Sequence, residues 1–364
     1  MRVTIFIGMA NLLLTTLTYF YYRYHLPIGK SWLFFICYFL LASTTVISRL
    51  LPNTTPYSVT YITSWIGGLW MAFTYYSLLL ALGHLLLCGL GKLFHWQLPS
   101  LKIAVGGLLL ISCFVAWGSL RAFQPEVRTE QITTSKLSAN SSYRIVLLTD
   151  VHLGRLLGRS YAEKLVTQIN GLRPDLVLIA GDLLDEKISY VLQDDSLSPL
   201  ANLQAPMGVY LAYGNHDYLD QPETWQRMVE QTNITVLRDK DIIVDEKLKL
   251  TGLNDYSHNR TMTTLVQLSV DNDKYYSVLL DHQPRKMEAA AAAGYDLYLS
   301  GHTHTGQLFP NRLITKKMYA LDYGRFDTGS FTAITSNGYG FWGTPVRTEV
   351  APELVVIEVS GKSR

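Results

Sequence analysis

Long apolar stretches fill the first third of the chain and are absent after it. Four of them are long enough to be membrane-spanning helices, because a bilayer core needs about 20 apolar residues in helical form. They cover residues 3–22, 31–51, 60–91 and 101–120. Polar or proline-containing segments separate them, and tyrosine and tryptophan gather near several ends, as at membrane surfaces. We therefore predict a transmembrane region of about four helices over residues 1–123.

A different pattern begins at residue 124, where short apolar runs alternate with segments of helical period. The pattern predicts an edge strand at 127–134 and further strands at 144–149, 176–180, 207–212, 234–237, 241–244, 247–252, 275–281, 296–300 and 354–359. It predicts helices at 159–172, 196–204, 222–232, 259–270 and 285–293. Alternating strands and helices indicate an α/β domain. The short late strands suggest a second sheet, so we expect a two-sheet β-sandwich flanked by helices over residues 124–364.

Polar motifs directly follow five of the predicted strands. They are Asp150-Val151-His152, Gly181-Asp182, Gly214-Asn215-His216-Asp217, Asp281-His282 and Gly301-His302-Thr303-His304. In α/β sheets, sites form outside the carboxyl ends of the strands, so these motifs are expected to converge.

The motifs offer a mixed set of nitrogen and oxygen ligands without sulfur. The candidates are Asp150, His152, Asp182, Asn215, His282, His302 and His304. Such a set suits Mn, Fe or Zn better than Ca or Mg. Seven ligands are too many for one tetrahedral ion and about right for two ions that share a bridge. Two such ions can hold a hydroxide between them and bind a phosphoryl oxygen.

Each motif alone has a simpler explanation. Gly-Asp and Gly-Asn pairs are common in turns, and a single buried histidine is more often a core residue than a ligand. The conjunction is what favours a metal site. Five of the nine histidines fall in these motifs, in order, and each motif follows a predicted strand.

Charge divides the chain at the same place as hydropathy. Residues 1–125 contain seven basic residues and no acidic one, which leaves 24 basic against all 29 acidic residues beyond. The overall charge of +2 therefore describes neither part, and no Lys/Arg run points to a nucleic-acid partner. The three cysteines, Cys37, Cys88 and Cys113, lie in the apolar stretches, so the second part has no thiol for a disulfide or a zinc site.

The five motifs, in this order, resemble those of the calcineurin-like metallophosphoesterases. The resemblance covers about residues 124–360 and is closest to the bacterial membrane-associated branch. It includes Asp185 in the second motif, Gln307 after the last one, and the later pattern Gly338-Tyr339-Gly340, Pro345-Val346-Arg347 and Pro352-Glu353. Thr305 stands where that branch usually has glycine, next to a ligand, and is expected to change the loop or the pocket without removing a ligand.

The resemblance implies a role for each motif residue. The implied ligands are Asp150, His152 and His304 for one metal, Asn215, His282 and His302 for the other, and Asp182 as the bridge. His216 would protonate the leaving oxygen after a bridging hydroxide attacks phosphorus, and Asp217 could orient its imidazole.

Two arginines follow the first motif. Arg155 and Arg159 could bind a substrate phosphate. The alternative, that they are solvated loop or helix-cap residues, stays open.

The expected function is that of a membrane-bound two-metal phosphoesterase that cleaves a phosphate ester or pyrophosphate bond, with a lipid-linked substrate. An alternative is a membrane-anchored enzyme for soluble nucleotides or sugar phosphates. A non-catalytic metal-binding scaffold would lack a ligand or His216, and none is missing. A transporter is poorly supported, because the apolar stretches contain no acidic residue.

Basic residues in the polar connections bear on membrane orientation. Segments 23–30 and 92–102 carry four, and the other side carries Arg2, Arg49 and Arg121. Four against three favours a multi-pass protein of the cell membrane with its second part outside the cytoplasm. The expected partners are the bilayer and a phosphorylated substrate; the sequence points to no protein partner.

Overall fold

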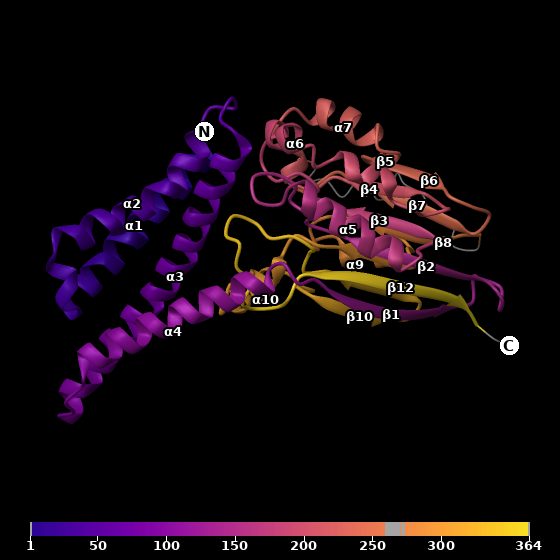
Figure 1. Ribbon diagram of the computed structural model, residues 1–364. Helices are drawn as coiled ribbons and strands as arrows, with labels where there is room; N and C mark the ends of the chain where they lie inside the picture. The colour runs from indigo at the N-terminus through magenta and orange to yellow at the C-terminus, as the bar shows by residue number, and fades with distance from the viewer. Residues whose placement is uncertain (1, 259–269, 271–273, 363–364) are drawn as a thin grey trace. The chain divides into compact units, whose positions relative to one another are not determined.

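The computed structural model describes residues 2–258, 270 and 274–362 (Figure 1). The chain forms two compact units. We call the first the helical unit; it comprises Met1–Arg121 with Gly343–Thr348. We call the second the sandwich unit; it comprises Ala122–Trp342 with Glu349–Arg364.

The helical unit contains a helix in each of the four predicted places. They are α1 (Arg2–His25), α2 (Trp32–Leu50), α3 (Tyr57–Phe94) and α4 (Ser100–Arg121), with a short turn, η1 (Pro27–Lys30), after the first. By length and hydropathy, α2, α3 and α4 could cross a membrane. Over the described residues α1 is not among these helices.

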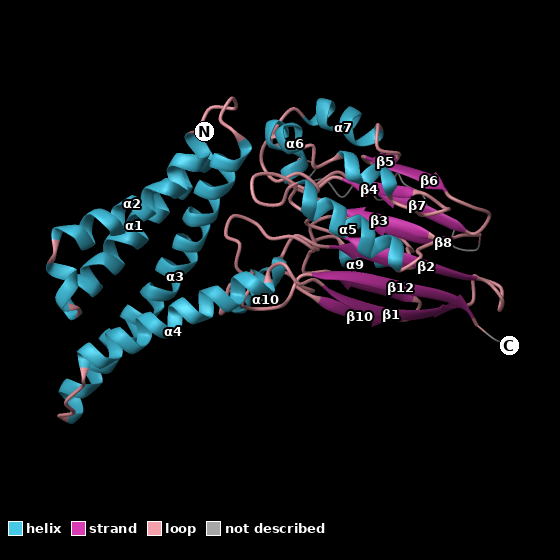
Figure 2. Ribbon diagram, viewed as in Figure 1, coloured by secondary structure: helices cyan, strands magenta, loops and turns pink. Residues whose placement is uncertain are grey.

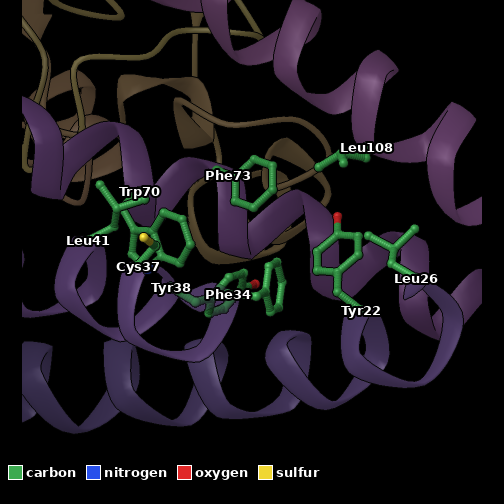
Figure 3. A pocket seen from close by; sticks show the side chains of 9 residues that line it. All are labelled: Tyr22, Leu26, Phe34, Cys37, Tyr38, Leu41, Trp70, Phe73 and Leu108. Atoms are coloured by element: carbon green, nitrogen blue, oxygen red, sulfur yellow. The ribbon is translucent and has the colours of Figure 1, made fainter. Parts of the chain in front are cut away.

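Aromatic side chains hold the helical unit together. Tyr22, Tyr38, Trp70 and Phe73 belong to one packed cluster and line a cavity (Figure 3). Buried hydroxyl groups find partners on neighbouring helices. Tyr38 donates to Thr18 Oγ1 at 2.8 Å, and the Tyr22 hydroxyl lies 2.9 Å from Ser77 Oγ. Such interhelical hydrogen bonds are what a helix bundle in an apolar medium uses in place of water.

The late segment Gly343–Thr348 belongs to the helical unit. Thr344 Oγ1 donates to the carbonyl of Gly68 at 2.9 Å, and the Arg347 amide donates to the carbonyl of Gly118 at 2.9 Å. The absence of a side chain at Gly118 is required here, since a Cβ atom would lie 2.6 Å from Thr348 Cγ2. The chain therefore returns to the helical unit more than 220 residues after leaving it, and no local sequence pattern signals this return.

The sandwich unit is built from two six-stranded mixed sheets, as predicted (Figure 2). The first has the order β1 (Glu126–Thr134), β12 (Glu353–Gly361), β2 (Ser142–Leu148), β3 (Leu176–Ala180), β4 (Val209–Ala212) and β5 (Ile234–Leu237). The second has the order β10 (Gly324–Thr328), β11 (Phe331–Thr335), β9 (Leu297–Ser300), β8 (Tyr276–Leu280), β7 (Leu248–Gly252) and β6 (Lys240–Ile243). The predicted edge strand is indeed at an edge, as β1.

Alternation along the strands builds the layers. Leu147 and Leu178 of the first sheet share a buried cluster with Leu250 of the second, so this apolar core lies between the sheets. The opposite face of the first sheet packs on α5 (Arg159–Gly171) and α7 (Pro222–Glu230). The outer face of the second sheet packs on α9 (Met287–Ala292).

Most predicted elements are present with small shifts of their ends, and the exceptions are short. The helix expected at 196–204 is only a 3₁₀ turn, η2 (Ser198–Asn202), because Pro199 interrupts helical hydrogen bonding. Two short helices, α6 (Ile188–Asp194) and α10 (Arg312–Met318), were not predicted. The helix expected over 259–270 falls outside the described residues apart from Val270.

Parallel pairing sets the position of the motifs. β2, β3 and β4 run parallel in the first sheet, and β7, β8 and β9 run parallel in the second. The carboxyl ends of each set therefore open on one edge, and the five polar motifs follow these ends.

Candidate metal centre

The first group of candidate ligands combines two segments that are far apart in the sequence. Asp150 and His152 follow β2, and His304 follows β9. His152 Nε2 lies 3.1 Å from His304 Nε2, and His304 Nε2 lies 3.4 Å from Asp150 Oδ1. Three buried ligand atoms thus surround one point, as a metal ion requires.

The second group comes from β3, β8 and β9. His282 Nε2 lies 3.2 Å from Asp182 Oδ2 and 3.1 Å from His302 Nδ1. Asp182 also lies 3.9 Å from His152 Nε2, a member of the first group. The Asp182 carboxylate therefore stands between the two groups, where a bridging ligand would be.

Asn215 supplies an independent sign that the site takes a cation. Its side-chain oxygen is buried and accepts no hydrogen bond among the described residues. An unpaired buried oxygen costs free energy unless something compensates it. A divalent ion would compensate the Asn215 oxygen. Together with the oxygen and nitrogen donors of the two groups, this oxygen fits the expected pair of divalent ions.

Backbone conformation at the motifs is unusual. Five of the seven candidate ligands have positive φ angles of 45–71°, namely Asp150, His152, Asp182, His302 and His304. Non-glycine residues rarely adopt this region, and such strain concentrates at functional sites. Gly181 precedes one of them with φ 85°, and a Cβ atom there would lie 2.5 Å from His282 Nδ1.

Thr305 has a backbone conformation that suits glycine better than threonine. Its φ is 52° and its ψ is 33°, in the left-handed region that a β-branched residue avoids. The residue is buried in the turn η4 (His304–Gly306), directly after a candidate ligand. The departure therefore puts strain on the loop and leaves the ligands in place.

Burial and neighbouring charges prepare the ligands for a metal. Burial by itself raises the pKa of Asp182, but His282 and then His216 outweigh it and hold that pKa well below its usual value. Burial, and then His282, lower the pKa of His302 to about 4. An ionised carboxylate and a neutral imidazole are the forms that bind metals.

His216 lies beside the ligands. Its amide donates to Asp182 Oδ1 at 2.8 Å, and its ring centroid is 4.8 Å from that of His152. Its Nδ1 contacts the backbone oxygen of Asp185, which can only accept, so Nδ1 carries hydrogen. Burial alone lowers the pKa of His216, but the Asp182 and Asp185 carboxylates outweigh burial and raise it.

Asp217 has a different task from the one expected. Its carboxylate accepts from the amides of Asp182, Leu184 and Gly214 at 2.9–3.0 Å and from Trp225 Nε1 at 3.1 Å. Those contacts fold the loop rather than orient the His216 imidazole. The backbone oxygen of Asp185 holds that ring instead. Asp185 was present in the second motif, but nothing in the sequence assigned it this position.

The two arginines after the first motif are engaged by carboxylates. Arg155 is buried, with Nη2 2.7 Å from Glu186 Oε1. Arg159 is exposed at the start of α5 and pairs with Glu163 and Asp195. These pairings argue against the phosphate-binding role expected of them.

Arg285 is a better candidate, and the sequence analysis missed it. Its guanidinium is exposed and packs on the rings of Tyr319, at 4.7 Å, and Tyr256, at 5.1 Å. The Tyr319 ring also contacts that of His302, at 5.9 Å. Among the described residues no carboxylate forms an ion pair with Arg285. Arg285 lies three residues after the candidate ligand His282. That closeness in the sequence was the only signal that could have pointed to it.

Comparison with known proteins agrees with this geometry. The family described as calcineurin-like phosphoesterase matches residues 143–306. A protein of Campylobacter jejuni described as an uncharacterized metallophosphoesterase is 31% identical over 263 residues, which are 70% of this chain and 69% of that protein. The chain belongs to the calcineurin-like metallophosphoesterase family. It is an enzyme, a metal-dependent phosphoric ester hydrolase.

Two further relatives were found, and the description of one of them names a transmembrane protein. A Helicobacter pylori metallophosphoesterase is 31% identical and covers 66% of this chain. A Danio rerio protein described as a transmembrane protein with metallophosphoesterase domain is 30% identical and covers 71%. The match spans 65% and 63% of these two proteins, slightly under two thirds of each. The substrate of this metallophosphoesterase is therefore a matter for proposal.

Proposed function

We propose that this metallophosphoesterase hydrolyses a phosphate ester or pyrophosphate bond of a lipid-linked substrate at a membrane. The observation that carries the proposal is the short connection between the helical unit and the sandwich unit. Only residues 122–125 separate the end of α4 from the start of β1. Four residues span at most about 14 Å. Substrates concentrated in the bilayer are therefore presented to the site at high effective concentration.

An apolar groove in the helical unit supports a lipid substrate. Its lining includes Leu41, Trp65, Leu69, Trp70 and Leu120, and it shares Leu41 and Trp70 with the cavity in Figure 3. Such a groove between membrane helices suits a hydrocarbon chain. The distribution of basic residues favours the extracytoplasmic side for the sandwich unit.

The ligand geometry supports two divalent ions. Asp150, His152 and His304 would hold one, Asn215, His282 and His302 the other, and Asp182 both. When bound, such a pair supplies an activated water and neutralises phosphoryl oxygens.

His216 is placed to act as the general acid. Because Nδ1–H is directed at the backbone oxygen of Asp185, Nε2 is the nitrogen left for the substrate. The Asp182 and Asp185 carboxylates raise the pKa of His216, which favours the protonated imidazole that a general acid needs. Donating its proton to the leaving oxygen avoids the release of an alkoxide.

Arg285 is placed to bind the substrate. Stacking on two tyrosine rings fixes a guanidinium near His302, and a planar guanidinium can bind two phosphate oxygens at once. It would hold a phosphoryl group next to the metal pair.

The test is hydrolysis of bis-p-nitrophenyl phosphate and p-nitrophenyl phosphate by the purified full chain with added Mn or with chelator. We expect turnover that needs metal, a loss of at least about 10²-fold in His216→Ala, and no turnover in Asp182→Ala. Arg285→Gln should raise KM more than it lowers kcat, and Arg159→Gln is its matched control.

The lipid part of the proposal has its own readout. Lipid-linked phosphodiesters and pyrophosphates in mixed micelles should be cleaved with higher kcat/KM than soluble nucleotides or sugar phosphates. The reverse order would favour the soluble-substrate alternative. Stoichiometric metal binding without turnover of any ester would support a scaffold.

A further inference from the structure

Residues 309–318 expose large apolar side chains beside the metal centre. The exposed fractions are 55% for Phe309, 67% for Leu313, 58% for Ile314 and 54% for Met318, and no residue of α10 is buried. We call these four side chains the α10 surface. Burying large apolar side chains is favourable, so their joint exposure is unfavourable in water. Contiguous exposed apolar patches mark interaction sites.

The stretch that carries the α10 surface is fixed at the rim of the site. It begins after Gln307, three residues beyond His304, and ends at Tyr319, whose ring contacts that of His302 at 5.9 Å. Asp322 holds its middle by accepting a hydrogen bond from Thr315 Oγ1 at 2.9 Å. The apolar side chains therefore project from a defined structure.

Charge on the same stretch is of one sign. From 309 to 321 there is no acidic residue, and α10 carries Arg312, Lys316 and Lys317. Lys316 and Lys317 are exposed and form no ion pair among the described residues. Apolar side chains combined with lysines are the composition of helices that lie in a membrane interface. Lysines near an anionic lipid surface are attracted to its acidic headgroups.

Besides Tyr319, Trp342 is an aromatic residue at the rim of the site. It is 43% exposed, and its ring lies 6.0 Å from that of His216. Its amide and carbonyl both bond the Gln307 side chain at 3.0 Å. Tryptophan is enriched where proteins meet lipid headgroups.

We propose that the α10 surface is a docking surface for an anionic phospholipid bilayer. The bilayer is favoured over a protein partner because helices long enough to cross a membrane are joined to the sandwich unit by four residues. A bilayer is then available at high effective concentration, and its acidic headgroups complement the lysines. Docking presents the rim of the metal centre to the headgroups. The proposal holds whatever the substrate is.

The test follows a fluorescent label on the full chain in vesicles. Alanine replaces Cys37, Cys88 and Cys113, and Ile314→Cys carries an environment-sensitive label. The control is Ile243→Cys, which is 55% exposed and lies at the opposite end of the parallel strands from the site. In vesicles with phosphatidylglycerol, we expect blue-shifted emission at position 314 and at least about two-fold quenching by spin-labelled acyl chains, with neither at 243.

Charge reversal tests the electrostatic part. Lys316→Glu with Lys317→Glu should reduce quenching at position 314 in anionic vesicles, with the thermal unfolding midpoint unchanged. Water-like emission at 314 in both anionic and neutral vesicles would overturn the proposal. A blue shift without quenching by lipid would also overturn it, since protein would then cover the surface. These readouts need no turnover, so failure of the lipid-substrate proposal leaves them intact.

Discussion

Two buried carboxylates near His216 differ in what they do. Asp217 accepts hydrogen bonds from three backbone amides and from the Trp225 indole, so it holds the loops after β3 and β4 together. Asp185 lies with Oδ1 3.6 Å from His152 Nδ1 and 3.7 Å from His216 Nδ1. The carboxylate that adjoins the general acid in space is therefore not the one that adjoins it in sequence.

Replacing Asp217 should affect folding more than chemistry. In Asp217→Asn, the amide NH₂ group would face amide donors, and the charge-assisted hydrogen bonds would be lost. We expect a loss of about 2–3 kcal/mol of stability, which for a domain of this size lowers the thermal unfolding midpoint by about 5–10 °C. Thermal unfolding of the metal-free protein in detergent measures this.

Trp225→Phe is the matched control for Asp217→Asn. It removes only the indole donor and keeps most of the ring, so a loss of about 1 kcal/mol is expected. An unchanged unfolding midpoint with a large fall in kcat in Asp217→Asn would contradict the assignment. Asp217 would then act on His216 after all.

At the scale of elements, the sequence predicted the sheets because strands and motifs carry strong local signals. Runs such as Leu176–Ala180 are wholly apolar and end in a polar motif, so both the strand and its functional end could be located. The convergence of the five motifs followed from parallel pairing. Neither conclusion required a knowledge of side-chain contacts.

The remaining features depend on contacts that no local pattern encodes. Arg155 and Arg285 look alike in sequence, but Glu186 neutralises the first and tyrosine rings hold the second. The short helix α10 escaped prediction because its apolar residues face outward and give no core-facing period.

Close approach of the loops makes Gly181 essential to the centre. The φ angle of Gly181 is 85°, which favours glycine over other residues. An added Cβ atom would also clash with His282 Nδ1 and the backbone of Gly214. We expect Gly181→Ala to cost at least about 2 kcal/mol of stability and to reduce bound metal, measured by elemental analysis. Gly171→Ala is the control, because a Cβ atom there meets nothing within 4 Å. Full metal content in Gly181→Ala would show that the loops can separate without harm.

At the scale of the whole molecule, one segment connects the site to the helical unit through the backbone. Trp342, beside His216, is followed directly by Gly343–Thr348, which packs within the helical unit. Tyr76 and Thr348 share a hydrogen bond there at 2.5 Å. A change in the position of Gly343–Thr348 can therefore be transmitted along the backbone to Trp342.

A substitution in α4 should consequently reduce activity. In Gly118→Leu, the new side chain would occupy the space of Thr348 and Val346, whose atoms lie 2.6 and 2.8 Å from the Cβ position. Displacing the segment should shift Trp342 and lower kcat for bis-p-nitrophenyl phosphate by about 10-fold or more, since misplacement of about 1 Å can cost 10²-fold. Trypsin should also cut at Arg347, which is buried in the native chain. Gly106→Leu, in the same helix and facing open space, should change neither property. Equal activity of the two variants would show that the site works independently of how this segment is seated.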